Sequence, residues 1–320
     1  MTNKDIFKEK RESYMKNATK RVRQEIWKNR YLYLFLIPGV LFFAIFSYKP
    51  MAGIILAFKK YNASLGIFGS KWVGFQHFER MFRTGDAIVA VKNTLIISLG
   101  RLVFEFPFPI LLAILINEMR GKKVKRVYQT IYTFPHFLSW VLIGTILTNF
   151  LSDRGTINSI LRLLGQPPVN FLANVSIFRG VIYITSIWKS AGWSAVIYMA
   201  AIAGISPEQY EAALVDGANR LQRIWHITLP GIRSTIIVLF ILQVGNMMNG
   251  GFDQIFNIYN PVVKPVSNII DTYVYSITFE SVADYGFSTA VGLFKSVVNI
   301  ILLLVANKTI SLLGEGGLFQ

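Results

Sequence analysis

Two lysines inside long apolar segments are the residues with the clearest capacity for chemistry. Lys189 lies in the apolar segment 177–204, and Lys295 lies in the apolar segment 286–312. A lysine in the middle of a membrane-spanning helix needs water or a partner of opposite charge. We therefore expect each ammonium group to meet a carboxylate, which belongs either to the protein or to a bound molecule.

Amide side chains form a polar stripe in another apolar segment. Gln243, Asn246 and Asn249 are spaced three residues apart, so on a helix they drift by about 60° per step and share one broad face. A second stripe, in the last apolar segment, consists of Ser288, Gly292, Lys295, Ser296 and Asn299. Polar residues in a membrane span avoid lipid, so both stripes are expected to face protein or a water-filled path. Two interpretations stay open, a path for a polar solute and hydrogen bonding between helices.

An earlier apolar segment contains a pair of opposite charges. Arg101 and Glu105 are one helical turn apart. An ion pair at this spacing lowers the cost of placing both charges in a membrane. We therefore predict that the two side chains pair within a span.

Motifs for catalysis and metal binding are absent from the sequence. The glycines near Lys71 and Lys122 lack the Walker A spacing of glycine, lysine and hydroxyl, and there is no Gly-x-Ser-x-Gly or His-Glu-x-x-His motif. There are no cysteines, and the histidines at positions 77, 136 and 226 are too far apart in sequence to form a helical metal-binding pair. We predict no catalytic residue, no metal ligand and no hydrolysis of ATP by this chain.

The longest polar stretch in the second half of the chain runs from Ser206 to Arg233. Ser206 is a good helix N-cap, and Pro207 suits the first helical turn. Gly217 tolerates the backbone angles of a C-terminal cap, and Pro230 is typical of a helix end. The pattern predicts two short helices with a break between them, a shape that suits docking into a groove on another protein.

This loop resembles the EAA loop of ABC-importer permeases. The resemblance rests on the spacing between an acidic start, a glycine and a Leu-Pro pair, carried by Glu211, Ala212, Ala213, Asp216, Gly217, Leu229 and Pro230. One departure is Arg233-Ser234, which stands where many relatives have a second proline. The resemblance implies that these residues couple the chain to a separate ATPase subunit, which would bind ATP and Mg²⁺ itself.

The likeness extends beyond the loop to much of the chain. The stretches Lys71–Phe75 and Trp225–Pro230 are similar to those of carbohydrate-uptake permeases, in the MalF/LplB-like branch that serves complex oligosaccharides. The resemblance implies a heterodimer of two permeases, two ABC ATPase subunits and an extracellular or periplasmic solute-binding protein. It also implies transport by alternating access, in which ATP binding favours an outward-open state.

If the substrate is a carbohydrate, the polar and aromatic residues of the spans are candidates for contact with sugar rings and hydroxyl groups. Trp188, Trp193 and Tyr198 could stack on sugar rings, although aromatic side chains also serve as packing and membrane anchors. The candidate substrate path consists of Trp188, Lys189, Trp193, Gln243, Asn246, Asn249, Lys295 and Asn299. If the substrate contains uronic acid, neutralising the two lysines would weaken uptake of acidic sugars selectively.

Six apolar segments are candidates for membrane-spanning helices. They lie at residues 31–58, 87–119, 127–151, 177–204, 234–249 and 286–312. About 19 Lys and Arg residues fall in segments that this alternation places inside, and about 9 fall outside, as the positive-inside rule requires. We predict an all-α, multi-pass protein of the bacterial cytoplasmic membrane, with six transmembrane helices and both termini cytoplasmic. The resemblance implies the fold of an ABC type I importer permease.

Composition agrees with a membrane protein. The hydrophobic fraction is 53% and the mean hydropathy is +0.45, while charged residues at 16% fall below the roughly 25% of soluble proteins. The net charge of +16 comes mostly from the N-terminus and one short loop, so the positive-inside rule explains it better than a nucleic-acid partner. We expect a basic cytoplasmic tail at residues 1–30, either solvated or near anionic lipid, and one transmembrane domain at residues 31–320 that includes the loop 206–233.

Other functions predict different patterns. A permease for another solute, such as glycerol phosphate or peptides, would share the loop. A membrane-embedded polysaccharide synthase would need clustered catalytic acids or arginines, whereas Asp253, Asp271 and Glu280 are scattered. A channel would have no use for an ATPase-docking loop.

Overall fold

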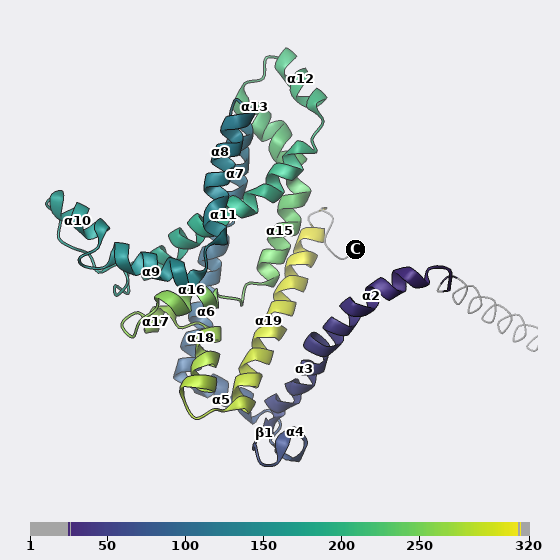
Figure 1. Cartoon of the computed structure of the whole chain (residues 1–320), viewed down its shortest axis with the longest axis vertical. Coiled ribbons are helices and arrows are strands. Elements are labelled where there is room, and N and C mark those ends of the chain that lie inside the picture. The colour runs from purple at the N-terminus through teal and green to yellow at the C-terminus, as the bar shows by residue number, and fades with distance from the viewer. Residues whose placement is uncertain (1–24, 26, 313, 315–320) are drawn as a thin grey trace, which may run out of the picture. The chain divides into compact units, whose positions relative to one another are not determined.

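The computed structural model describes residues 25, 27–312 and 314, and the chain divides into two compact units, residues 1–55 and 56–320. In the first unit, helix α2 (Arg30–Phe43) continues through a π-helical turn (Ala44–Tyr48) into α3 (Lys49–Met51) (Figure 1). None of the residues of α2 is buried. Pro50 directly follows the π-helical turn within this continuous helical stretch, where its ring removes one backbone N–H donor from the helix. The predicted basic tail lies almost wholly outside the described residues.

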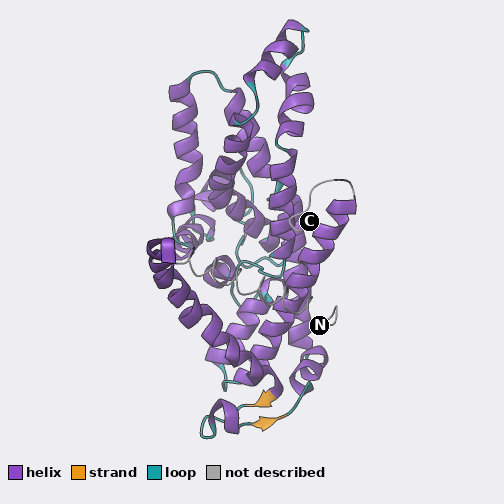
Figure 2. Ribbon diagram, turned by 90° about the vertical axis from the view of Figure 1, so that its right-hand side faces the viewer, coloured by secondary structure: helices purple, strands orange, loops and turns teal. Residues whose placement is uncertain are grey.

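A small hairpin follows at the start of the second unit, after a 3₁₀ helix (Ala52–Phe58). Strands β1 (Lys59–Lys60) and β2 (Lys71–Trp72) pair antiparallel around the short helix α4 (Gly66–Gly69) (Figure 2). Lys59 stabilises this turn because its Nζ donates to the carbonyls of Ile67 and Phe68, at 2.9 Å each.

The rest of the second unit is a bundle of helices (Figures 1 and 2). Their bounds are α5 (Gln76–Arg83), α6 (Gly85–Phe104), α7 (Pro107–Glu118), α8 (Lys122–Thr133), α9 (Trp140–Leu151), α10 (Thr156–Leu163), α11 (Phe178–Ala203), α12 (Pro207–Val215), α13 (Arg220–Arg223), α14 (Leu229–Gly231), α15 (Arg233–Gly245), α16 (Phe252–Ile258), α17 (Lys264–Ser267), α18 (Ile270–Tyr275) and α19 (Tyr285–Leu312). Helix α11 packs against α7 and α8, α15 packs against α19, and α16 packs against α9. The predicted all-α class is confirmed, with the two-residue strands as a small addition.

Within the described residues, three continuous helical stretches are long and apolar enough to cross a membrane, namely Arg30–Phe58, Gly85–Glu118 and Tyr285–Leu312. Three further pairs of helices pass the same test but are bent, so the number of candidate spans is up to six if each bent pair is one span. This agrees with the six spans predicted from the sequence.

The third predicted span is not one straight helix. Helix α8 ends in a 3₁₀ turn (Phe134–Phe137), and the segments on either side of the break are bent by 99°. Pro135 is the second residue of this turn, and Ser139 caps the next helix by accepting a hydrogen bond from the N–H of Leu142 at 3.2 Å. A proline cannot continue the backbone hydrogen bonds of α8, which explains why the predicted third span 127–151 is a bent pair of helices.

The predicted amide stripe also needs correction, because α15 ends at Gly245. Gln243 is therefore helical, while Asn246 and Asn249 lie in the turn beyond it. The Nδ2 of Asn249 donates to the Oδ1 of Asn246 at 3.1 Å, so these two residues bond to each other instead of extending a helical face.

Two of the three apolar clusters that the described residues form inside the bundle lie toward opposite ends of α11. One, toward the end of α11 that follows the loop after α10, includes Ile97, Phe178, Ile182, Ile255 and Ile269. The other, toward the opposite end of α11, includes Ala113, Ile114, Ala195, Tyr198, Ile202 and Ile232. Apolar burial of this kind holds the helices in register, and the polar residues of the middle of α11 lie between the two clusters.

Candidate functional site

A polar cavity of about 470 Å³ lies along the middle of α11. Residues of α6, α7, the α8–α9 break and α15 complete its wall. Its polar and aromatic lining residues are Arg101, Glu105, Phe106, His136, Trp140, Ser186, Lys189, Ser190, Ser194, Tyr198, Gln243 and Asn246. Three predicted path residues, Lys189, Gln243 and Asn246, therefore share one cavity.

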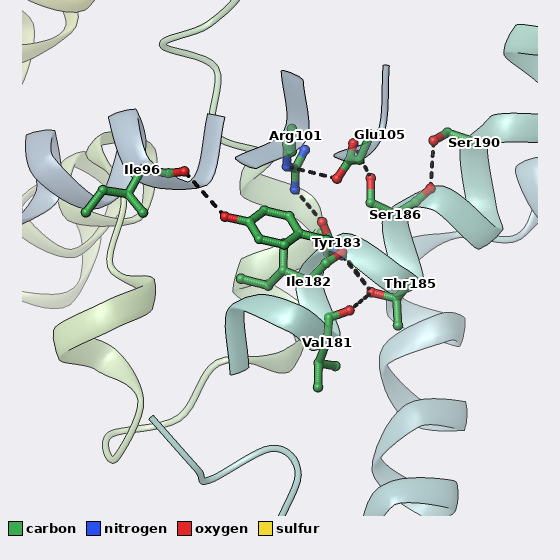
Figure 3. Close-up of polar contacts among 10 residues, drawn as sticks. Ile96, Arg101, Glu105, Val181, Ile182, Tyr183, Thr185, Ser186 and Ser190 are labelled. Atoms are coloured by element: carbon green, nitrogen blue, oxygen red, sulfur yellow. Dashed lines mark hydrogen bonds and ion pairs between the residues drawn. The ribbon is translucent and has the colours of Figure 1, made fainter. Parts of the chain in front are cut away.

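The predicted ion pair of Arg101 and Glu105 lines this cavity. Figure 3 shows the pair with the polar contacts around it. Arg101 Nε lies 3.6 Å from Glu105 Oε1, and both side chains are largely buried. Glu105 Oε2 accepts a hydrogen bond from Ser186 Oγ of α11 at 2.9 Å. The pair thus ties α6 to α11.

Gln254 extends this network to a third helix, α16. Its side chain is 1% exposed, and its Oε1 accepts a hydrogen bond from Arg101 Nη2. Its Nε2 donates to the Ile182 carbonyl and to Thr185 Oγ1, at 2.8 Å each. Every polar atom of this buried amide group is bonded, so α16 is fixed at the cavity wall.

Lys189 reaches from α11 to the break between α8 and α9. Its Nζ donates to the carbonyl oxygens of His136 and Leu138, at 2.8 and 2.6 Å. These carbonyls are free to accept because the helix is interrupted there. The Nζ also lies 5.6 Å from the ring centroid of Trp140, which lines the same cavity.

The predicted aromatic residues are arranged in two ways. Trp193 stacks on His136 with ring centroids 4.7 Å apart and contacts Phe137 edge-on, so its ring stabilises the break in the third span. Tyr198 is buried and lines the cavity. Trp188 is 48% exposed and is not among the lining residues of this cavity.

The remaining predicted path residues have partners elsewhere. Lys295 Nζ lies 2.5 Å from Asp271 Oδ1 of α18, so its expected carboxylate belongs to the protein. Asn299 Oδ1 accepts from the N–H of Met248 at 2.8 Å and ties α19 to the turn after α15. Neither Lys295, Asn299 nor Asn249 lines the cavity, so the structure separates them from Lys189.

The polar loop 206–233 contains the helices expected from its sequence, α12 and α13. Asn219 begins α13 with a capping box, in which its side chain accepts from the Gln222 N–H and the Gln222 side chain accepts from the Asn219 N–H. Gly217 has φ +77°, as a glycine cap between two helices requires. The second helical stretch continues through Pro230 to Gly231, slightly farther than predicted.

The loop exposes an apolar surface. No residue of α12 is buried, and Leu214 and Val215 are 60% and 88% exposed. The turn side of the loop is hollowed by a cavity of about 320 Å³ whose lining includes Ala213, Asp216 and Gly217. Five predicted coupling residues are exposed, namely Glu211, Ala212, Asp216, Gly217 and Pro230.

Several cavity residues were not predicted as site residues. Arg101 and Glu105 were expected to pair but were not predicted to line the substrate path. Their position was a usable signal, because charged residues within an apolar span often mark a functional path. The sequence carries no comparable signal for Gln254, which lies in a segment expected outside the membrane. Its role depends on the packing of α16 against Arg101, which lies 153 positions earlier, and against Ile182, which lies 72 positions earlier.

Comparison with known proteins decides the family. The profile of the family "Binding-protein-dependent transport system inner membrane component" matches residues 106–308. The chain belongs to this family. The permease is 46% identical to protein LplB of Bacillus subtilis (strain 168) over 91% of this chain and 92% of that protein. It is 42% identical to the polygalacturonan/rhamnogalacturonan transport system permease protein YteP of the same organism, over 96% and 95% of the two chains.

Solved structures confirm the permease fold. A chain of a bacterial ABC transporter involved in the import of the acidic polysaccharide alginate matches with a TM-score of 0.84 and 39% identity, over 90% of this permease and 98% of that chain. A second match is to the bacterial alginate ABC transporter in complex with an alginate pentasaccharide-bound periplasmic protein. Its TM-score is 0.85 at 38% identity, over 93% of this permease and all of that chain. The predicted resemblance to ABC-importer permeases of the carbohydrate-uptake group is confirmed.

Proposed function

We infer that this permease imports oligosaccharides that contain uronic acid, as one of two permease subunits in an ABC importer of the bacterial cytoplasmic membrane. The observation that carries the proposal is the near full-length match to a chain of the alginate importer in complex with its sugar-bound periplasmic protein. The relative YteP, named for transport of polygalacturonan and rhamnogalacturonan, points to the same class of acidic sugar. The polar cavity along α11 is a place where a sugar can leave water without losing hydrogen bonds.

The loop 206–233 supports an ATPase partner. Its first helix buries no residue in the bundle and exposes Leu214 and Val215, an apolar surface that an ATPase cleft can cover. Glu211, Ala213 and Gly217 lie at the proposed contact. Tyr210 and Thr228 hydrogen-bond across the loop at 3.0 Å, so a movement of α12 is transmitted to the helices that lead into α15.

Purification of the tagged permease from its native host in mild detergent, beside a Glu211→Lys variant, tests the assembly. We expect a second permease and an ATPase to co-purify with the wild type, and the ATPase to be lost from the variant, because a reversed charge in the contact disrupts docking. A Glu25→Lys variant serves as the control, because it makes the same charge change far from the loop in sequence.

The same complex tests the substrate class. With its binding protein, the wild-type complex should hydrolyse ATP faster when oligogalacturonides or alginate oligomers are added. A permease that purifies alone, with a Glu211→Lys variant that behaves identically, would return the synthase and channel interpretations to consideration. A complex stimulated only by neutral sugars, glycerol phosphate or peptides would overturn the acidic-sugar proposal.

A further inference from the structure

Lys189 carries a charge that the protein leaves unneutralised. Arg101 faces the carboxylate of Glu105, and Lys295 faces that of Asp271. In contrast, the hydrogen bonds of Lys189 Nζ go to two neutral carbonyl oxygens. Among the described residues, no carboxylate forms an ion pair with Lys189.

The position of this charge matters because Lys189 lines the polar cavity. The charges of Arg101 and Glu105 offset each other, so Lys189 is the unbalanced charge among the Lys, Arg, Asp and Glu residues that line the cavity. An ammonium group has three N–H donors, and two are used by the carbonyls of His136 and Leu138. The third donor is available to a ligand oxygen.

The surroundings of Lys189 suit a sugar acid. The indole of Trp140 lies beside the ammonium group and lines the cavity, so an aromatic ring and a cation are presented together. A uronic acid residue has the complementary chemistry, an apolar ring face and a carboxylate. Gln243 and Asn246 supply amide groups on the α15 side of the cavity, where hydroxyl groups can bond.

We propose that Lys189 is a specificity-determining residue that binds a substrate carboxylate in the cavity. This proposal rests on the proposed function, because it assigns the recognition of the acidic sugar to one side chain. A charge-assisted hydrogen bond from the ammonium group to the carboxylate replaces the missing ion pair. The two carbonyls of the α8–α9 break hold the ammonium group in place before the sugar arrives.

Equilibrium binding to the purified importer, without the soluble binding protein, measures the preference of the membrane subunits alone. The probes are oligogalacturonides and alginate oligomers, each compared with the same oligomer after chemical reduction of its carboxyl groups. The variants are Lys189→Gln, which keeps hydrogen-bond donors for the two carbonyls but removes the charge, and Lys189→Arg, which keeps both. Arg179→Gln is the matched control, since Arg179 is another cation of α11 with neutral partners, Asn93 Oδ1 and the Val266 carbonyl, away from the cavity.

We expect Lys189→Gln to weaken binding of the acidic oligomers about tenfold or more, and to leave the reduced oligomers nearly unchanged. Lys189→Arg and Arg179→Gln should keep the wild-type preference for the acidic forms. If Lys189→Gln weakens both forms in parallel, Lys189 only caps the helix break and the proposal is overturned. If it keeps the wild-type preference, another group recognises the carboxylate and the proposal is equally overturned.

The same measurement separates this proposal from the proposed function. If the wild-type importer binds the acidic and the reduced oligomers equally well, the proposed acidic substrate class is contradicted. The proposed role of Lys189 is then contradicted as well. A wild-type importer that prefers the acidic forms, combined with an unaltered preference in Lys189→Gln, leaves the proposed function standing and removes only the role of Lys189.

Discussion

At the scale of single residues, the bundle places its charges in pairs or against carbonyl groups. Arg101 with Glu105 and Lys295 with Asp271 are ion pairs, and Lys189 lies against backbone oxygens. Each arrangement lowers the cost of a charge away from water. The pairs differ in what they join, because the first links α6 to α11 and α16, and the second links α18 to α19.

The Arg101–Glu105 pair should be more sensitive to loss of one partner than to loss of both. Arg101→Met leaves the largely buried carboxylate of Glu105 without its counter-charge, and we expect a loss of about 3 kcal/mol of stability. The double variant Arg101→Met with Glu105→Leu should recover most of that loss, because no unpaired charge remains. Thermal unfolding of the purified complex measures this, and a double variant less stable than Arg101→Met would show that the pair stabilises the bundle outright.

Lys295 should affect stability and not substrate choice, which differs from the hypothesis that both lysines recognise acidic sugars. Its ammonium group is occupied by Asp271, and it does not line the cavity. We expect Lys295→Gln to lower the melting temperature while the ratio of binding between acidic and reduced oligomers stays at the wild-type value. A ratio that falls as it does in Lys189→Gln would show that Lys295 reaches the substrate.

At the scale of elements, α11 is the helix on which the site is built. It supplies Ser186, Lys189, Ser190, Ser194 and Tyr198 to the cavity, and it packs against both α7 and α8. Its approach to α8 is close, because a Cβ on Gly192 would collide with the backbone carbonyl of Tyr132. Small residues permit such helix contacts in membranes, where packing replaces the hydrophobic effect as the source of association.

Two glycines of α11 make a matched test of this packing. Gly192→Ala forces α11 and α8 apart, and we expect a loss of about 1–3 kcal/mol of stability. Gly180→Ala has no atom within 4 Å of the added Cβ, so it should be neutral or stabilising by up to about 1 kcal/mol through helix propensity. Melting temperatures of the two purified variants check this, and equal values would mean that the close approach of α8 does not limit the packing of α11.

At the scale of the whole molecule, the orientation in the membrane stays a prediction from the distribution of basic residues. The loop 206–233 and the basic segment 120–126 are expected on the cytoplasmic side, together with both termini. The loop around Gly165 and the segment 250–285 are expected outside. This arrangement is required if a cytoplasmic ATPase docks on α12.

Reporter fusions test the orientation directly. A fluorescent protein inserted after Gly121 or at the C-terminus should fluoresce, because it folds in the cytoplasm. Alkaline phosphatase fused after Gly165 should be active, because it requires an oxidising exterior compartment. The opposite pattern at any of the three sites would change the number or the direction of the spans.

The sequence by itself determined the all-α class, the six candidate spans in outline, and the two helices of the loop 206–233. These features depend on local patterns, which are runs of apolar residues, the proline at position 207 in the first turn of α12, and the glycine break at Gly217. The ion pair of Arg101 with Glu105 was also predictable, because its partners are one turn apart on one helix.

Only the tertiary structure decided which polar groups meet. Gln254 bonds to Arg101, Ile182 and Thr185 across long separations in sequence, and Lys295 finds Asp271 on a neighbouring helix. Lys189 lines the cavity and donates to the carbonyls of His136 and Leu138. These carbonyls belong to the break between α8 and α9, which cannot be inferred from the sequence of α11. The apolar surroundings of these polar side chains show that each needs a hydrogen-bond or ion-pair partner. Which residue becomes the partner depends on how the helices pack, and local sequence patterns do not specify that packing.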